Sequence, residues 1–335
     1  MIPTALTASG IDSMAGNGHY DPLQSATPLP IQAEYFPMGY PLRVASNSER
    51  VHLTAASIWS RYPRLSSEPA VRLNIAVSAG NRALPPPPPS FRGRDHLFSV
   101  VADRDHFASA DLRAGIGFAF FTDTVSNDYL RYQFLEPLAY LLIAARYLTF
   151  THSACVALSG RGILLCGDSG AGKTCLAFAC ARKGWTFISG DATAVVRGRD
   201  DYLLRGRPFE IRFRETAQRL FPELEQYPRA IRPNGKDDIE IDPRDLRLKC
   251  ALEGTASQIV FLERSPSPIP AVAETFPSTE ALRRLEQAIC FGDESSRRDQ
   301  LRSLETLLTL PTHRLRYYDL DSAERVLRSL VGGRR

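Results

Sequence analysis

One stretch, GDSGAGKT (Gly167 to Thr174), constrains the fold of this 335-residue chain more than any other. It fits the pattern GxxxxGK[ST] in full, and the glycines of such a loop let backbone N–H groups turn inward and surround an anion. An apolar run, GILLCG (Gly162 to Gly167), comes before it, and a helical run, TCLAFACARK (Thr174 to Lys183), follows it. A strand, a glycine-rich turn and a helix in this order predict an α/β fold in which the helix N-terminus binds phosphate.

The side chains of this loop predict a nucleotide site, with ATP and Mg²⁺ as cofactors. Lys173 would reach the β- and γ-phosphates, and the hydroxyl of Thr174 would bind Mg²⁺. Only four of the 41 lysines and arginines are lysines, so the lysine of the motif is not expected by chance. The predicted nucleotide-binding residues are Gly167, Asp168, Ser169, Gly170, Ala171, Gly172, Lys173 and Thr174.

Two residues close to the loop in sequence could add chemistry. Asp191 ends the apolar run GWTFISGD (Gly184 to Asp191), at the sheet edge where phosphates are expected. It could order Mg²⁺ or accept a proton from an attacking hydroxyl, or it could only cap the end of a strand. His152 begins the strand-like run HSACVALS, where a histidine is either catalytic or structural.

A third candidate is the segment RPNGKDDIEID (Arg232 to Asp242), in which Asn-Gly indicates a turn. Arg232 or Lys236 in this loop could contact the transferring phosphoryl group, as arginine fingers do. The alternative is a hairpin turn with a lysine in solvent.

The chain is predicted to divide into three parts. Residues 1–28 are rich in Ser, Gly, Pro and Ala and are expected to be poorly ordered. Residues 29–125, with strand-like runs such as VRLNIAVSA (Val71 to Ala79), are expected to form a smaller mixed α/β N-terminal domain of unknown role. Residues 126–335 would form the domain that carries the glycine-rich loop.

Three local patterns add detail. Apolar residues recur at helical spacing between Asp128 and Tyr147, which predicts a helix. Two strand-like runs between His152 and Gly167, joined by GRG (Gly160 to Gly162), predict a β-hairpin that leads into the loop. The prolines from Pro85 to Pro89 must be an extended connection, either a surface loop or a docking segment for a proline-reading partner.

Composition argues against several partners. The net charge is +4 and basic residues form no long run, so no nucleic-acid partner is predicted. The N-terminus lacks the features of a signal peptide, and the most apolar stretch (Phe134 to Phe150) is interrupted by charges, so we expect a cytoplasmic protein without a membrane partner. The six cysteines form no CxxC pair and are expected to be structural thiols.

The stretch from His152 to about Glu240 resembles the C-terminal catalytic domain of HPr kinase/phosphorylase, a bacterial serine kinase. That family carries a histidine, then a GDSGxGKS loop, then a strand that ends in Asp-Asp, at spacings like those seen here. The resemblance implies a P-loop kinase domain of the HPr kinase and PEP-carboxykinase-like type, and a homo-oligomer. It also implies that Asp191 accepts the substrate's proton, that His152 is the active-site histidine, and that Glu210 of a Glu-Ile-Arg sequence binds magnesium.

The chain departs from this family at three places. Gly190 stands where the family has the first acid of its Asp-Asp pair. Phe213 and Arg214 replace a glycine-containing continuation that the family links to phosphorolysis, so weak phosphorolysis is expected. The first 125 residues carry no motif of the family's usual regulatory domain. These departures indicate a divergent member.

The leading expectation is therefore an ATP-dependent kinase that transfers the γ-phosphoryl group to a serine-type hydroxyl of a protein, peptide or small molecule. Lys173 would hold phosphate charge, Asp191 would be the general base, and Thr174 with Glu210 would bind Mg²⁺. One alternative is a nucleotide-binding regulatory module, a degraded kinase in which Gly190 has weakened or abolished transfer. Another is a P-loop ATPase that drives a partner.

Overall fold

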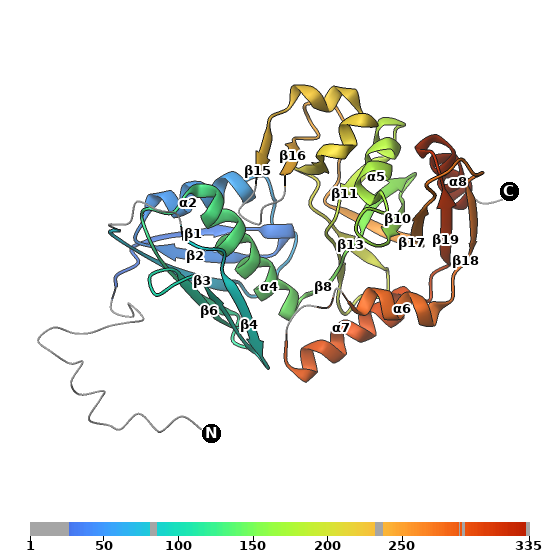
Figure 1. Ribbon diagram of the computed structural model, residues 1–335. Helices are drawn as coiled ribbons and strands as arrows, with labels where there is room; N and C mark the ends of the chain where they lie inside the picture. Colours follow the sequence, from blue (N-terminus) through green and yellow to red (C-terminus); the bar gives the residue numbers. More distant parts are fainter. Residues whose placement is uncertain (1–26, 81–85, 232–236, 288, 290–291, 333–335) are drawn as a thin grey trace, which may run out of the picture.

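The structure, a computed structural model, is an α/β protein whose described residues form three β-sheets (Figure 1). The α/β class expected from the sequence is therefore confirmed. The predictions for Arg232, Lys236 and Cys290, and for nearly all of residues 1–28, lie outside the described residues. The described residues are 27–80, 86–231, 237–287, 289 and 292–332.

The first sheet is built from the N-terminal part of the chain, and the structure describes seven strands in it. The strands β2, β3 and β7 are parallel to one another, whereas the other neighbours are antiparallel. In sheet order they are β1 (Ile31–Tyr35), β2 (Leu42–Ser46), β3 (Val71–Ser78), β7 (Ile116–Thr122), β6 (Phe107–Asp111), β5 (Leu97–Val101) and β4 (Ser90–Arg94).

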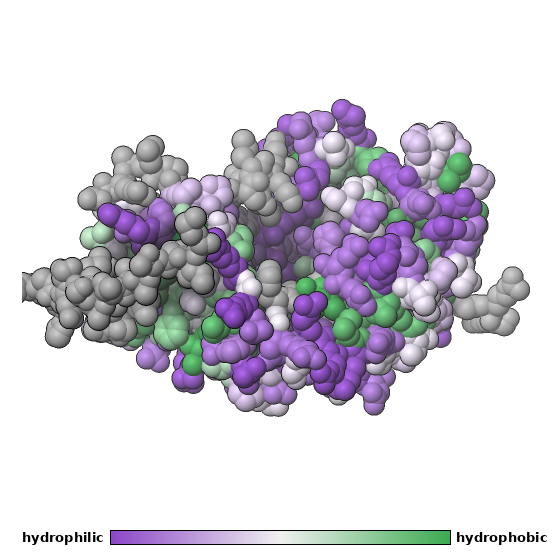
Figure 2. Space-filling model, turned by 60° about the horizontal axis from the view of Figure 1, so that its bottom comes forward, coloured by the Kyte–Doolittle hydropathy of each residue, from purple (hydrophilic) through white to green (hydrophobic). Residues whose placement is uncertain are grey.

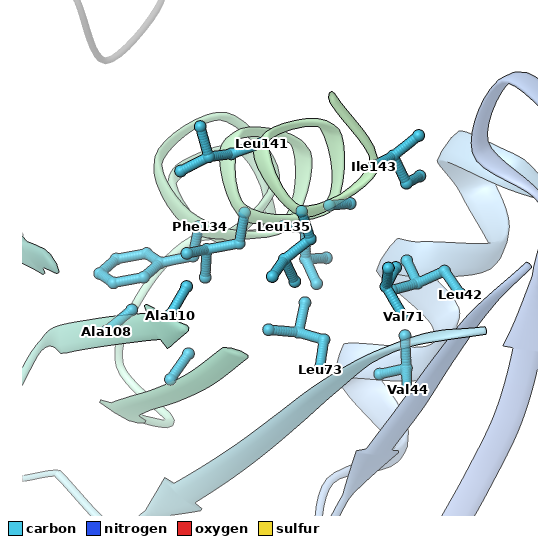
Figure 3. Close-up of a cluster of buried hydrophobic side chains, with 14 of the residues drawn as sticks. Leu42, Val44, Val71, Leu73, Ala108, Ala110, Phe134, Leu135, Leu141 and Ile143 are labelled. Atoms are coloured by element: carbon cyan, nitrogen blue, oxygen red, sulfur yellow. The ribbon is translucent and has the colours of Figure 1, made fainter. Parts of the chain in front are cut away.

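Helices cover one face of this sheet. They are α2 (Glu49–Trp59), the short η1 (Pro37–Gly39), and a continuous run of α3 (Asn127–Tyr129), the π-helical η2 (Leu130–Leu135) and α4 (Glu136–Arg146). Figure 3 shows Phe134 and Leu135 of this run pointing toward Leu73 and Ala110 of the sheet. The helix predicted between residues 128 and 147 is confirmed, and its apolar face belongs to the core of the first sheet. The domain boundary at residue 126 stays a prediction.

The second sheet carries the glycine-rich loop. Its main path is β11 (Thr186–Ser189), β9 (Ala154–Leu158), β10 (Arg161–Cys166), β17 (Glu253–Arg264), β13 (Leu203–Arg205), β12 (Thr193–Val196) and β8 (Leu148–Thr151). Beyond this path, β19 (Thr312–Tyr317) pairs with β17 and with β18 (Val272–Thr275). The predicted hairpin is confirmed, because β9 and β10 are antiparallel neighbours.

Strand alternation explains why helices lie on both faces of the second sheet. Ile163 and Leu165 of β10 point into the core that contains α5 (Lys173–Arg182) and α8 (Leu320–Gly332). Leu164 and Cys166 point into the opposite core, which contains α6 (Ser278–Glu286) and α7 (Glu294–Leu307). A strand that is apolar on both sides, as GILLC is, becomes a central strand buried by helices on each face.

The third sheet is small and lies against α5. In order it contains β14 (Ile211–Arg214), β16 (Asp237–Ile241) and β15 (Arg229–Ile231), all antiparallel, and η3 (Glu215–Arg219) and η4 (Pro222–Gln226) follow β14. The ring of Phe178 on α5 packs edge-on against Phe213, with 5.1 Å between the centroids, and against Phe221 at 4.8 Å. These contacts fix the third sheet beside the middle of α5.

The surface is mostly hydrophilic, and three of the cysteines are buried. Hydrophilic residues prevail on the face drawn in Figure 2, and hydrophobic ones form small patches. Among the helices that the structure describes, none combines the length and apolar character that a membrane crossing requires. Cys155, Cys166 and Cys180 are buried free thiols, and burial raises the pKa of Cys166 to about 12, so they serve as apolar packing residues as predicted.

Candidate functional site

The glycine loop (Gly167–Thr174) joins the central strand β10 to the N-terminus of α5. β10 is parallel to β17, and β17 is parallel to β19, so the carboxyl ends of all three strands meet at one edge of the sheet. Ligands of α/β proteins bind outside this edge. The loop therefore stands where the fold brings together residues that are far apart in sequence.

All three glycines of the loop, Gly167, Gly170 and Gly172, have positive φ, a backbone conformation that other residues rarely adopt. Gly170 and Gly172 have φ of +88° and +89°, in the left-handed region. A Cβ on Gly172 would also lie 2.4 Å from the Tyr317 hydroxyl, which donates a hydrogen bond of 2.8 Å to the carbonyl of Ala171. The glycines are thus required by the turn itself, and Tyr317 at the end of β19 holds its backbone in place.

The loop folds around the ammonium group of Lys173. Its Nζ donates to the carbonyl of Gly167 at 2.7 Å and to that of Asp168 at 3.0 Å, and only 7% of the residue is exposed. Burial lowers the pKa of Lys173, while the charges of Asp168 and Asp191 act in the opposite direction. Two carbonyl oxygens of the loop thus hold a positive charge that can attract an anion.

Thr174 connects the loop to the segment after β11. Its hydroxyl donates to the carbonyl of Gly190 at 2.9 Å, which leaves lone pairs on the hydroxyl oxygen to bind a cation. The next residue, Asp191, is exposed and lines the same cavity as Thr174. The first turn of α5 and the acid after β11 thus come together, although 17 positions separate Thr174 from Asp191.

A cavity of about 620 Å³ opens beside the loop, and we call it the loop cavity. Its walls include Lys173 and Thr174, together with His152 from the turn between β8 and β9. Cationic side chains outnumber acidic ones in its lining, which favours a polyanionic ligand. The charged residues that line it are Lys173, Arg212, Arg214, Arg219, Arg264, Asp191 and Asp238.

A second cavity of about 850 Å³ adjoins the first and shares Gly170, Leu220 and Arg264 with it. It runs along α5 to the carboxyl end of β19, where Tyr318 lines it. Leu220 and Tyr318, which line this second cavity, are 36% and 40% exposed, so their apolar surface is accessible to a ligand there. The two cavities together offer a charged part and a partly apolar part.

Of the residues predicted for the site, His152, Lys173, Thr174 and Asp191 all line the loop cavity, while Glu210 does not. Glu210 lies in a largely buried group of three arginines and three glutamates, which we call the charge cluster. Its members are Arg131, Glu136, Arg207, Glu210, Arg212 and Glu240.

Each oxygen of Glu210 faces guanidinium groups. Arg212 approaches it at 2.8 Å, and Arg131 and Arg207 both donate to it. To bind Mg²⁺, Glu210 would have to exchange at least one of these partners for the ion. Its role as a metal ligand stays a prediction, and the structure places it beside the cavity in contact with a cavity residue, Arg212.

The charge cluster joins the helical run of the first sheet to the third sheet. Arg131 and Glu136 come from η2 and α4, whereas Arg212 and Glu240 face each other on β14 and β16. Burial opposes the charge of Arg212, but neighbouring carboxylates led by Glu210 outweigh it and raise its pKa. For the carboxyl group of Glu136, burial alone would raise the pKa. Arg207 and the other arginines outweigh this effect and hold the pKa of Glu136 below its ordinary value.

Sequence reasoning missed Asp238, Arg264 and the arginines beyond the loop. A partial signal exists, because charged and apolar residues alternate in both IRFR (Ile211–Arg214) and DDIEI (Asp237–Ile241). Alternation places the charges of each strand on one face, and the antiparallel register sets Arg214 opposite Asp238. Arg264 gave no such signal, since only the parallel pairing of β17 with β10 brings it to the loop.

The described residues contain no group of three or more His, Cys, Asp or Glu side chains that could hold a metal by themselves. The donors around the loop, a Thr hydroxyl and carboxylates, are oxygen ligands of the kind that Mg²⁺ prefers. Mg²⁺ commonly binds through one or two carboxylates plus substrate phosphates and water. The residues present therefore fit an ion that would enter together with a nucleotide.

The chain shows only weak similarity to known proteins. No family model matches the sequence, and no curated protein matches it. Among solved structures, the chain is similar to the HPr(Ser) kinase/phosphatase from Coxiella burnetii, at 10% identity over 55% of this chain and 93% of that chain. The TM-score is 0.29, too low for this similarity to support an argument about fold or function.

Proposed function

We propose that this chain is an ATP-dependent phosphotransferase that moves the γ-phosphoryl group to a hydroxyl of a protein, peptide or small molecule. The observation that carries the proposal is the meeting of Lys173, Thr174 and Asp191 in one cationic cavity at the mouth of the glycine loop. Phosphoryl transfer requires mainly positioning and charge stabilisation, and these residues can supply both.

Each residue has a stated task in the reaction. Backbone N–H groups of the loop and the ammonium of Lys173 hold the β- and γ-phosphates. Mg²⁺, entering with the nucleotide, would neutralise phosphate charge and would be held in part by Thr174. Asp191 accepts the proton of the acceptor hydroxyl while the oxygen of that hydroxyl forms a bond to the γ-phosphorus. The bond from that phosphorus to the β,γ-bridging oxygen breaks, and its electron pair leaves with ADP.

The adjoining cavity supports a nucleoside triphosphate as the donor. A triphosphate in the loop cavity would extend past Gly170 and Arg264, which line both spaces. There, Leu220 and Tyr318 offer an apolar wall and a ring for a base.

A second candidate is a regulatory module that binds nucleotide without transferring phosphoryl groups. It is favoured by Gly190, which leaves no side chain next to Thr174 where the resembled family has an acid. Binding and transfer must therefore be measured separately.

The first test is nucleotide binding, measured by isothermal titration calorimetry with ATP and Mg²⁺. Lys173→Ala should weaken binding more than about 10-fold, because the loop loses its point charge. Lys249→Ala is the matched control, since Lys249 is exposed and does not line the loop cavity. Equal affinities of the wild type and Lys173→Ala would refute the nucleotide site.

A further inference from the structure

A small cavity of about 370 Å³ opens beside the first sheet, and three of the residues that line it are arginines. They are Arg43 near the start of β2, Arg72 near the start of β3 and Arg146 at the end of α4. The other described residues that line it are uncharged prolines, alanines and glycines. We call this space the arginine pocket, and no described residue lines both it and the loop cavity.

The two strand arginines face each other on the side of the sheet away from its core. Their neighbours along each strand are buried in the core that the helices cover, as Figure 3 shows for Leu42, Val44, Val71 and Leu73. Alternation therefore turns Arg43 and Arg72 to the opposite face, where both are exposed. The parallel register of β2 and β3 sets these two arginines directly opposite each other. Like charges at such positions repel, so this arrangement does not favour the fold by itself.

Carboxylates on the neighbouring strands are engaged elsewhere. Glu34 on β1 is opposite Arg43, but the ion pair of its carboxylate is with Arg64, at 3.9 Å. The carboxylate of Asp111 accepts hydrogen bonds from backbone N–H groups of the turn after β6. In the part of the chain that the structure describes, the guanidinium groups of Arg43 and Arg72 form no hydrogen bond or ion pair. Their donors are therefore available to a ligand.

The third arginine is held in place by its own contacts. Arg146 donates from Nη1 to the carbonyl of Arg113 at 2.7 Å and from Nε to the hydroxyl of Tyr147 at 3.3 Å. Its side chain also lies against Gly115, where a Cβ would be 3.2 Å from Cδ of Arg146. These hydrogen bonds use Nη1 and Nε, so Nη2 can donate to a ligand. A guanidinium group that is already fixed loses less conformational freedom when a ligand binds.

We propose that the arginine pocket binds the phosphate group of a small molecule. Guanidinium groups bind phosphate oxygens in pairs, and an anion among the three arginines would offset the repulsion between Arg43 and Arg72. Three cations suit a phosphate with two negative charges better than a carboxylate with one. The volume of the pocket fits a small phosphorylated compound. The glycine loop contributes no residue to this pocket, so the inference goes beyond the proposed function and does not depend on it.

The test is the binding of pyrophosphate to Lys173→Ala, measured by isothermal titration calorimetry at constant ionic strength. Lys173→Ala is used because it weakens phosphate binding at the glycine loop. This variant should still bind pyrophosphate, and adding Arg43→Gln and Arg72→Gln should weaken that binding at least about 10-fold. Adding Arg104→Gln instead should leave the affinity unchanged, because the Arg104 side chain is 87% exposed and lies outside the pocket.

Stability without ligand separates binding from a structural role. Removing two opposed positive charges from an exposed face should leave Tm at low salt equal to that of the Arg104→Gln control or above it. A lower Tm would show that Arg43 and Arg72 stabilise the fold and would overturn the inference. It is also overturned if Lys173→Ala binds no pyrophosphate, or if Arg43→Gln and Arg72→Gln leave the affinity unchanged.

Discussion

We expect Glu136→Gln, a change in the charge cluster that hardly alters the shape of the side chain, to cause a large loss of stability. Glu136 is 6% exposed and accepts hydrogen bonds from Arg131 at 2.7 Å and Arg207 at 2.9 Å. Glutamine keeps the volume but removes one of three carboxylates facing three guanidinium groups. Breaking a buried ion pair on one side costs about 3–5 kcal/mol, and we expect the lower end because the amide oxygen can still accept.

Thermal unfolding followed by calorimetry measures this effect. At about 2 °C per kcal/mol for a chain of this size, Tm should fall by roughly 6 °C. Glu294→Gln is the matched control, because Glu294 is 90% exposed in a helical pair with Arg298 and should contribute less than about 1 kcal/mol. Equal Tm values for the two variants would refute the view that the cluster ties the helical run to the third sheet.

Three further predictions follow from single contacts. Gly172→Ala should abolish measurable ATP binding in calorimetry, because its Cβ would meet the Tyr317 hydroxyl at 2.4 Å and φ is +89°. The pKa of Glu136 is lower in the folded state than its ordinary value of 4.5, so the ionised carboxylate stabilises the fold at pH values above 4.5. That stability is lost as the pH falls through the folded-state pKa. Tm measured from about pH 7 to about pH 3 should therefore fall less steeply in Glu136→Gln than in the wild type. Trp185→Phe should cost about 1–3 kcal/mol in denaturant unfolding, because the indole N–H donates to the buried Glu324 at 2.8 Å; an unchanged midpoint would contradict this.

Local sequence patterns predicted the part of the site that is local in the chain. The hairpin, the glycine loop and α5 follow one another within 31 residues, from His152 to Arg182, and each has its own pattern of apolar residues or glycines. His152, Lys173 and Asp191 also line one cavity, because β9 is antiparallel to β10 and β11, so the start of β9 and the ends of β10 and β11 lie at the same edge of the second sheet. Their chemical roles stay predictions until binding and transfer are measured.

The remaining parts depend on contacts that no local pattern records. Arg131 reaches Glu210 and Glu240 from a helix that packs on another sheet, so the charge cluster could not be assembled from spacing. Helix α7 was not predicted either, and its buried side includes the polar Gln300, which weakens the apolar periodicity. The resemblance supplied a role for Glu210 but not the guanidinium groups around it.

The central claim is that the loop cavity both binds ATP and transfers its γ-phosphoryl group with Asp191 as the base. The most direct measurement follows radiolabelled γ-phosphate from ATP into a panel of serine-containing peptides and small hydroxyl compounds, for the wild type and Asp191→Asn, with ATP affinity measured beside it. The account predicts transfer by the wild type and a loss of about 10²–10⁴-fold in Asp191→Asn while ATP binding persists. Full transfer by Asp191→Asn, or ATP binding without transfer by the wild type, would contradict it.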